Sequence, residues 1–450
     1  MSSRSSRAKI DPLHVIDGTV KLPGSKSLTN RALLMAALAE GPSVLHNVLD
    51  CDDSRYLIKA LKQLGVQIEA DWGGDSSSNS IVVHGVDAEF PVKSGRFFVG
   101  NAGTAARFLT AALTTTGGDY VLDGDSRMRE RPIEFLVRAL SELGGEVAAP
   151  TGCPPVTIGP RPLQGGRIDI PGHVSSQFIS ALLMAAPLCR KPVEIRVTGG
   201  LVSRPYLDLT LEGMRAFGVT VCADDKRADG QPVFKVPAGK GYRGREYHVE
   251  GDASTASYFY GIAAVSGGSI RVEGVGKESP QGDAQCADVL ASMGCRVKKD
   301  REAVTVTGPR PPHGLLKGVD CNCSEIPDVV PTLAVVALFA NGRTRLRGAA
   351  HLRHKESDRI TAVATELRKL GGDVKELPDG LEIQGVLGSD PSPLHGASID
   401  TWGDHRIAMA FSLASLCIPD VVINDPDVVS KSFPDYFEVL RELGVKVSLE

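Results

Sequence analysis

Apolar helices recur along the chain, and each is entered through a turn that holds glycine or proline together with polar residues. The first unit runs from Leu22 to Leu38, and its turn carries Lys26 and hydroxyl side chains before an Ala/Leu-rich helix. The other units cover residues 99–113, 170–186, 249–264, 324–340 and 401–416. The pattern therefore predicts six copies of one structural unit.

A second landmark has nearly the same period. An amphipathic run, a glycine and an alternating apolar stretch occur together six times, and the glycines are Gly65, Gly144, Gly218, Gly294, Gly371 and Gly444. The steps between them are 79, 74, 76, 77 and 73 residues. A glycine directly after a helix adopts the left-handed conformation that closes it, and alternation begins a strand. Any α/β protein alternates helix, glycine and strand, but it would not keep so constant a period. Each repeat is therefore predicted to be strand, helix, strand, helix and extra strand, which is longer than a solenoid repeat.

Six repeats divide naturally into two similar lobes of three. The division falls near residues 247–251, after the glycine-rich, charged loop 237–246, and residues 14–22 read as a strand that precedes the first repeat. Two short chain crossings are expected to act as a hinge, because hinges absorb motion in a few residues.

Composition excludes several classes of protein. The chain has 450 residues, of which 42% are apolar and 23% charged, as in an ordinary globular protein of two or three domains. No apolar run approaches the roughly 18 residues needed to cross a bilayer, and a net charge of -4 lacks the basic footprint of a nucleic-acid binder. Nine thinly spread cysteines indicate free thiols in a reducing compartment, with Cys321 and Cys323 interpreted as structural. We expect a cytoplasmic protein with no membrane and no nucleic-acid partner.

Four of the helix turns indicate a site for anions. They hold, in chain order, Ser25, Lys26, Ser27 and Arg31; Asn101, Gly103, Thr104 and Arg107; Ser175, Ser176 and Gln177; and Asp404, His405 and Arg406. A helix N-terminus offers unpaired N–H groups and the positive end of the helix dipole, so several that converge would bind a polyanion. A single Ser or Asn is more simply an N-cap. A positive charge, however, opposes the dipole. Each helix is therefore destabilised by its cation, Lys26, Arg31 or Arg406, unless an anion offsets the charge.

Three loops add cations and two unusual acids. The loops 125–134, 351–360 and 429–437 contain Arg127, Arg129, Arg131, Lys355, Arg359 and Lys431. Simple charge runs would be solvated surface, but apolar helices flank these loops, and arginine suits a bidentate grip on phosphate or carboxylate. Glu356 and Asp328, the latter at the mouth of the fifth helix, are acids in cationic surroundings. Such a carboxylate can serve as a general acid or base.

Motifs of several other enzyme classes are missing. The chain has no G-x-x-x-x-G-K-[ST], so ATP-driven phosphoryl transfer is unsupported. Residues 100–103 form only a fragment of a dinucleotide-binding loop, and no G-x-S-x-G elbow occurs.

Ten motifs stand in order along the chain: LPGSKSLTNRALL, GNAGTAARFL, RMRERPI, SSQF, SRPY, EGDAS, the turn at 326–328, KESDR, DHRIAM and KSFPDYF. Together they resemble the 5-enolpyruvylshikimate-3-phosphate (EPSP) synthase family over nearly the whole chain from Val15 onward. The resemblance implies an inside-out α/β barrel with two similar lobes, each of three βαβαββ repeats. Residues 23–250 would form the N-terminal lobe, and residues 1–22 plus 251–450 the discontinuous C-terminal lobe.

The resemblance also implies a reaction and its residues. The enolpyruvyl group of phosphoenolpyruvate would pass to the 5-hydroxyl of shikimate 3-phosphate with release of phosphate, in a monomer that needs no metal and no cofactor. Shikimate 3-phosphate is expected to contact Lys26, Ser27, Arg31, Ser175, Ser176, Gln177, Ser203, Tyr206, Asp328 and Lys355. Phosphoenolpyruvate is expected to contact Lys26, Asn101, Gly103, Arg131, Gln177, Glu356, Arg359, His405, Arg406 and Lys431. Asp328 would accept the hydroxyl proton, and either Glu356 or Lys26 would protonate the methylene carbon. Glyphosate, an anionic phosphonate, would occupy the phosphoenolpyruvate pocket beside Gly103.

Three positions depart from the family pattern. His351 stands where many members have an asparagine that contacts the sugar-like substrate, and His354 replaces an apolar residue. Phe108 replaces a proline, which would alter the pitch of the helix that follows Gly103. None of the three is a proposed acid.

Two other functions fit the same fold. A UDP-N-acetylglucosamine enolpyruvyl transferase uses the same donor but has a cysteine in the loop that here runs from Asp125 to Arg131, where none occurs. A catalytically dead anion-binding protein would have lost the acids, yet Asp328 and Glu356 are both present. Phosphate release from phosphoenolpyruvate with each acceptor in turn distinguishes these functions.

Overall fold

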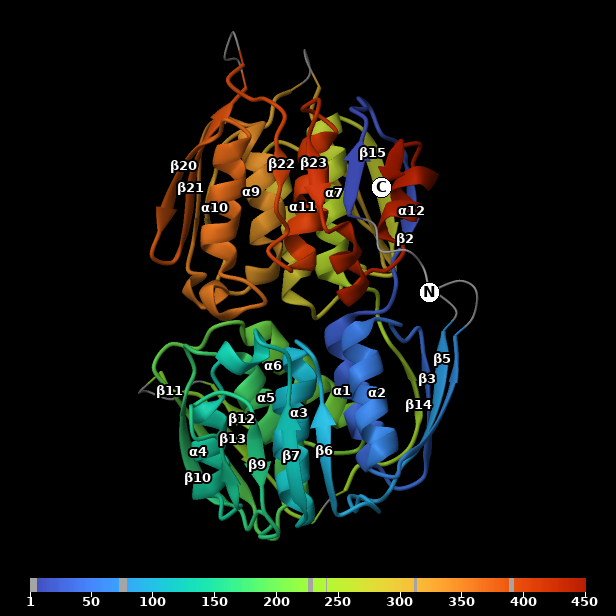
Figure 1. The fold of residues 1–450 in the computed structure, drawn as a ribbon, viewed down its shortest axis with the longest axis vertical. Coiled ribbons are helices and arrows are strands. Elements are labelled where there is room, and N and C mark those ends of the chain that lie inside the picture. Colours follow the sequence, from blue (N-terminus) through green and yellow to red (C-terminus); the bar gives the residue numbers. More distant parts are fainter. Residues whose placement is uncertain (1–5, 73–78, 226–229, 240, 311–313, 388–391) are drawn as a thin grey trace. The chain divides into compact units, whose positions relative to one another are not determined.

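The chain forms two compact units (Figure 1). Each unit contains its own hydrophobic core. A computed structural model describes residues 6–72, 79–225, 230–239, 241–310, 314–387 and 392–450. Unit 1 consists of residues 1–23 and 251–450, and unit 2 of residues 24–250. The chain therefore crosses between the units twice. Residue 240 of the charged loop predicted at 237–246 lies outside the described residues.

The described part of unit 2 contains three four-stranded sheets with one common plan. The first, in the order β14-β3-β5-β4, contains Glu246–His248, Pro42–His46, Ser80–His84 and Gln67–Asp71. The second, β6-β7-β9-β8, contains Ser94–Phe98, Asp119–Asp123, Val156–Ile158 and Val147–Ala148. The third, β10-β11-β13-β12, contains Gly166–Pro171, Val193–Thr198, Val233–Val236 and Cys222–Asp224. In each sheet the first two strands are parallel and the other neighbours antiparallel.

Unit 1 repeats this plan in its described residues. One sheet, β16-β17-β15-β2, contains Arg296–Lys299, Ala303–Thr307, Ser269–Glu273 and Gly18–Lys21. Another, β18-β19-β21-β20, contains Asp320–Asn322, Asn341–Arg347, Gly380–Val386 and Asp373–Leu377. The last, β22-β23-β1-β24, contains Ser398–Ile399, Val422–Asn424, Arg7–Ile10 and Val447–Leu449. Again each sheet has one parallel pair.

Six inner helices correspond to the apolar helices predicted from the sequence. They are α1 (Lys26–Leu38), α3 (Gly103–Thr116), α5 (Ser176–Ala185), α7 (Ala253–Ser266), α9 (Val330–Leu338) and α11 (His405–Ser415). Every residue of α9 and α11 is buried. In unit 1, helices α7, α9 and α11 contact one another, and in unit 2 helix α3 contacts α1 and α5. Helices that are apolar all round belong in an interior, so the helices form the centre of each unit.

The second helix of each repeat has an exposed face. These helices are α2 (Asp52–Gln63), α4 (Glu134–Glu142), α6 (Arg204–Ala216), α8 (Cys286–Ser292), α10 (Arg359–Lys369) and α12 (Tyr436–Glu442). Short 3-10 helices cover Met128–Glu130 (η1), Ala186–Leu188 (η2), Gly282–Gln285 (η3), Pro327–Val329 (η4), Ala350–His354 (η5) and Pro426–Lys431 (η6).

The six glycines that revealed the repeat follow these outer helices. The φ angles of Gly65, Gly144, Gly218, Gly294, Gly371 and Gly444 are 91°, 93°, 92°, 107°, 86° and 85°. This region is open to glycine and strained for other residues. The repeat is visible in the sequence because every copy ends its second helix in the same way.

A strand leads out of each unit at the two crossings. Strand β2, before the first crossing, pairs in parallel with β15 of unit 1, with Val20 opposite Val272. Strand β14, before the second crossing, pairs in parallel with β3 of unit 2, with His248 opposite His46. Across the described ranges, every helix is too short or too polar to pass through a membrane.

Candidate active site

The carboxylate of Asp328 is surrounded by cations in unit 1. Asp328 lies in η4, directly before the buried helix α9. Its Oδ1 accepts a hydrogen bond from Arg359 Nη1 at 2.9 Å, and its Oδ2 accepts one from Arg406 Nη2 at 2.8 Å. Lys355 Nζ lies 3.8 Å from Oδ1. The structure thus brings together four of the residues predicted from the sequence.

These neighbours decide the charge of Asp328. Burial disfavours the ionised carboxylate, but the positive charges of Arg406, Lys355 and Arg359 outweigh it and hold the pKa of Asp328 well below its usual range. Asp328 is therefore ionised at neutral pH.

Arg359 is the centre of this network, at the N-terminus of α10. Its side chain is only 2% exposed, and its Nη2 donates to Glu356 Oε2 at 2.9 Å. Its Nε donates to Asp404 Oδ2 at 2.8 Å, and Asp404 is completely buried. Burial alone would lower the pKa of Arg359, but Asp404, Glu356 and Asp328 raise it above its ordinary value. The guanidinium remains charged in the interior because three carboxylates surround it.

Another buried acid lies close to this network. Asp283 in η3 accepts a hydrogen bond from the hydroxyl of Ser254. Burial, and next the negative charge of Asp328, raise the pKa of Asp283 to about 7. Two carboxylates of the same unit therefore have pKa values shifted in opposite directions, as in sites that move protons.

The remaining proposed substrate-binding residues of unit 1, His405 and Lys431, are also buried. His405 follows Asp404, the N-cap of α11, and its Nδ1 lies 3.6 Å from Asp404 Oδ1. Lys431 is buried at the end of η6. Burial, and next the charge of Lys355, lower the pKa of His351 to about 3, so this side chain is neutral at physiological pH. His354 is exposed.

In unit 2, Lys26 is paired within the protein. Lys26 opens α1, and its Nζ lies 3.5 Å from Oδ2 of the buried Asp53 in α2. The sequence predicts that a cation here needs an anion to offset the helix dipole. Asp53 supplies one, just as Asp328 does for Arg406.

Arg31, on the same helix, is held by neutral oxygen atoms. Its Nε donates to Thr210 Oγ1 at 2.8 Å, and its Nη1 donates to the carbonyl of Ser27 at 2.9 Å. The Arg31 guanidinium lies 5.2 Å from the ring centre of the buried Phe108. Burial lowers the pKa of Arg31 to about 10. Helix α3 is continuous through Phe108 from Gly103 to Thr116.

The turn before α3 holds the side chain of Arg131 through hydrogen bonds. Nη1 of Arg131 donates to the backbone carbonyl of Asn101 at 3.0 Å and to its side-chain Oδ1 at 2.8 Å. A Cβ atom on Gly103 would lie 2.5 Å from Arg131 Nη2. Only glycine leaves space for the guanidinium in this position. Arg107 of α3 binds the loop that carries Arg131, because its Nη2 donates a hydrogen bond to the carbonyl of Pro132 at 3.0 Å.

The predicted hydroxyl residues stand at two further helix starts of unit 2. Ser175 caps α5, since its Oγ accepts a hydrogen bond from the N–H of Gln177 at 3.2 Å, and Ser176 is the first residue of that helix. Ser203 precedes α6 with φ of 54°. The carbonyl of Tyr206, in the first turn of α6, accepts from Arg31 Nη2 at 3.1 Å. Two residues of α6, Tyr206 and Thr210, thus accept hydrogen bonds from Arg31 of α1.

Comparison with known proteins identifies the family. The family model described as EPSP synthase (3-phosphoshikimate 1-carboxyvinyltransferase) matches residues 10–440. The chain belongs to the EPSP synthase family. It is 49% identical over 431 residues to 3-phosphoshikimate 1-carboxyvinyltransferase of Thiobacillus denitrificans, covering 95% of this chain and 97% of the relative. It is 47% identical over 457 residues to the chloroplastic 3-phosphoshikimate 1-carboxyvinyltransferase of Arabidopsis thaliana, covering 98% of this chain and 85% of the relative.

Solved structures support the same fold. An EPSP synthase from Acinetobacter baumannii matches with a TM-score of 0.79 at 29% identity and covers 99% of this chain and 100% of that chain. The enolpyruvyl transferase NikO from Streptomyces tendae matches with a TM-score of 0.76 at 18% identity over 99% of each chain, which supports the fold alone. The predicted fold class and family are confirmed.

Three acids of this EPSP synthase family member, Asp283, Asp404 and Asp53, escaped the sequence analysis as site residues. Asp404 stands beside two predicted residues, His405 and Arg406, but its side chain reads as an ordinary N-cap, which it also is. Asp53 follows Asp52 at the start of an amphipathic helix and gives no signal of its partner. Only the packing of α1 against α2 shows that it faces Lys26.

Proposed function

We propose that this protein transfers the enolpyruvyl group of phosphoenolpyruvate to the 5-hydroxyl of shikimate 3-phosphate and releases phosphate. Membership of the EPSP synthase family supports the reaction. The observation that carries the chemistry is the Asp328 carboxylate, ionised and in contact with Arg359 and Arg406. Both proposed substrates are small polyanions, which suit these cations.

Asp328 is the proposed acceptor of the hydroxyl proton. Its two arginine partners make it a weak base, because they stabilise the ionised form. An anionic substrate that draws Arg359 and Arg406 toward itself would weaken those contacts and raise the pKa of Asp328. The carboxylate would thus become a better proton acceptor when the donor substrate is bound.

The proton that reaches the methylene carbon of phosphoenolpyruvate has two proposed sources. Glu356 forms an ion pair with Arg359 in unit 1, and Lys26 forms an ion pair with Asp53 in unit 2. Both remain candidates for this general acid. The hydroxyl oxygen forms the new bond to the enolpyruvyl carbon as the methylene carbon gains this proton and becomes a methyl group. A proton then leaves the methyl group, which restores the double bond as the bond from the enolpyruvyl carbon to the phosphate oxygen breaks.

Arg31 is proposed to neutralise an anionic group of shikimate 3-phosphate, together with the hydroxyl residues at the starts of α5 and α6. Its charge is buried among neutral acceptors, and burial lowers its pKa. An anion beside it would therefore stabilise the charged guanidinium.

The test is phosphate release from phosphoenolpyruvate with two acceptors supplied in turn. Shikimate 3-phosphate should support turnover, and UDP-N-acetylglucosamine should not. Release with the nucleotide sugar alone would assign the protein to the sister enzyme class. Absence of release with either acceptor would favour the anion-binding function.

The reducing cytoplasm is the proposed compartment. All nine cysteines are free thiols, and the sulfur atoms of Cys321 and Cys323 lie 3.8 Å apart. Unpaired thiols are typical of proteins that stay in a reducing environment. Cell fractionation with an antibody against the protein would check this.

A further inference from the structure

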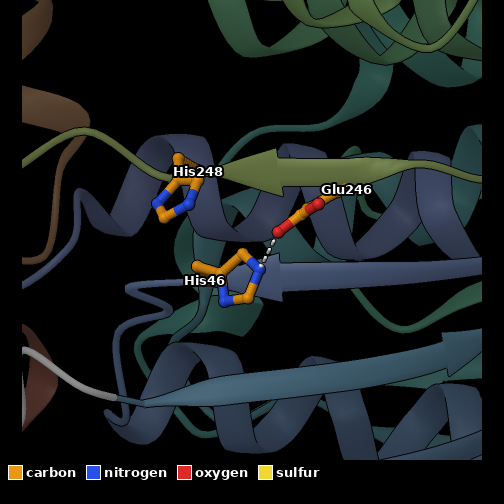
Figure 2. A group of neighbouring side chains, drawn as sticks. All are labelled: His46, Glu246 and His248. Atoms are coloured by element: carbon orange, nitrogen blue, oxygen red, sulfur yellow. Dashed lines mark hydrogen bonds and ion pairs between the residues drawn. The ribbon is translucent and has the colours of Figure 1, made fainter.

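Two histidines and a glutamate meet at the edge of a sheet in unit 2 (Figure 2). His46 ends strand β3, and Glu246 and His248 belong to β14, the edge strand that pairs with β3 in parallel. Glu246 and His248 are two residues apart and therefore share one face of the strand. His46 is the partner of His248 in the register, so all three side chains gather on that face.

The possible ligand atoms of these three side chains lie near one another. His46 Nε2 lies 2.8 Å from Glu246 Oε1, and the rings of His46 and His248 are stacked with centroids 4.5 Å apart. One ligand atom from each residue falls within 4.8 Å of the other two. Three ligands of a tetrahedral zinc ion stand about 3.3 Å apart, given metal–ligand lengths of about 2.0–2.1 Å. Small side-chain rotations would therefore bring the three atoms onto one ion.

We propose that His46, Glu246 and His248 bind one divalent transition-metal ion of the zinc type. Two imidazoles and one carboxylate are ligands for such ions, whereas magnesium and calcium prefer oxygen alone. Three protein ligands leave a position for water. The site is accessible, since the His46 side chain is 30% exposed and that of Glu246 is 70% exposed.

The simpler interpretation is a surface hydrogen bond between a histidine and a glutamate. The same sheet contains such a pair, in which His84 Nε2 lies 3.0 Å from Glu69 Oε1. Within the described ranges, however, only the His46 group assembles three His, Cys, Asp or Glu ligands at this spacing. The His84 pair is therefore a matched control, with the same hydrogen bond but without the third ligand.

The place of the site in the chain suggests what the ion would do. Val249 follows His248, and its carbonyl accepts a hydrogen bond from Asn47 Nδ2 at 2.9 Å. The chain leaves unit 2 directly afterwards, at residue 251. An ion shared by His46 and His248 would fasten β14 to β3 immediately before this crossing. None of the three ligands belongs to the residues proposed for the reaction.

Titration of the metal-free, full-length protein with Co²⁺ tests the proposal, because Co²⁺ occupies zinc sites and absorbs visible light. The parent should bind one equivalent per chain, and Zn²⁺ should displace it. His46→Gln and His248→Gln should each weaken binding by at least about tenfold, whereas His84→Gln should bind like the parent. Circular dichroism and phosphate release in metal-free buffer should be the same for all four proteins.

Hydrogen exchange supplies a second, local readout. Zn²⁺ should slow exchange of the amides at residues 246–249 in the parent and in His84→Gln, but not in His46→Gln. Equal Co²⁺ affinity of the parent and His46→Gln would overturn the proposal. So would the intense near-ultraviolet absorption of a thiolate-bound ion, or a parent that binds no Co²⁺.

Discussion

Replacement of Gly103 by alanine is expected to act through Arg131. The added Cβ would lie 2.5 Å from Arg131 Nη2, 3.0 Å from Cζ and 3.1 Å from Nη1. Unbonded carbon atoms are stable at about 3.5–4.0 Å, so the guanidinium must move by roughly 1 Å. The end of a long side chain can do this without unfolding the protein, and alanine is favourable in a helix. The expected effect is therefore on binding and not on stability.

The contacts of Arg131 set the size of this effect. Its Nη1 bonds to two oxygen atoms of Asn101, which fix the direction of the guanidinium. A hydrogen bond to a charged group contributes about 1.5–3 kcal/mol. If the shifted Arg131 loses one such bond to phosphoenolpyruvate or glyphosate, affinity falls by about 10- to 100-fold, since 1.4 kcal/mol corresponds to tenfold.

Steady-state kinetics at saturating shikimate 3-phosphate measures this. The parent should be inhibited by glyphosate competitively with phosphoenolpyruvate, and Gly103→Ala should raise both the KM for phosphoenolpyruvate and the glyphosate inhibition constant. Gly200→Ala is the control, because a Cβ there has no atom within 4 Å. In a double-mutant cycle, Gly103→Ala and Arg131→Lys should be clearly non-additive. A KM within about twofold of the parent, or additive effects, would refute the reasoning.

Three further predictions concern acids of unit 1. Asp328→Ala and Glu356→Gln should each lower kcat by roughly 100- to 10,000-fold while calorimetry still detects shikimate 3-phosphate binding; activity within a few-fold of the parent would contradict the assigned roles. Asp404→Ala removes a buried partner of Arg359 and should lower the free energy of unfolding in urea by about 3–5 kcal/mol, and an unchanged value would show that the pair is not structural. Asp283 has a folded pKa of about 7 against an ordinary 3.8, so the folded state keeps a proton that the unfolded state releases. Because of this carboxyl, the free energy of unfolding should fall by about 3 kcal/mol as pH rises from 5 to 8. In Asp283→Asn, the free energy of unfolding should change less over this pH range than in the parent.

The fold could be predicted because each repeat has a pattern that is visible in a short stretch of sequence. A glycine such as Gly65 must have a positive φ wherever an outer helix closes, and an inner helix such as α9 is apolar on every face. Both properties depend on neighbouring residues, so they appear as patterns in the sequence.

Contacts between distant segments could not be predicted in this way. Lys26 was identified as a cation that needs an anion, but its partner Asp53 depends on how α1 packs against α2. His46 and Glu246 are 200 residues apart, and only the register of β14 on β3 unites them. The sequence therefore shows which side chains are unusual, and the packing shows which of them meet.

The strands at the two crossings have a consequence for the order of folding. All strands of unit 2 lie between residues 24 and 250, so its three sheets can be complete once that stretch has been synthesised. In unit 1, β2 must wait for β15, and β1 must wait for β23 and β24 at the end of the chain. Domains generally fold as units while the ribosome is still extending the chain. Strand β1 is thus synthesised before its partners and is among the last strands of unit 1 to pair, and loss of β24 would leave β1 with an open edge prone to association.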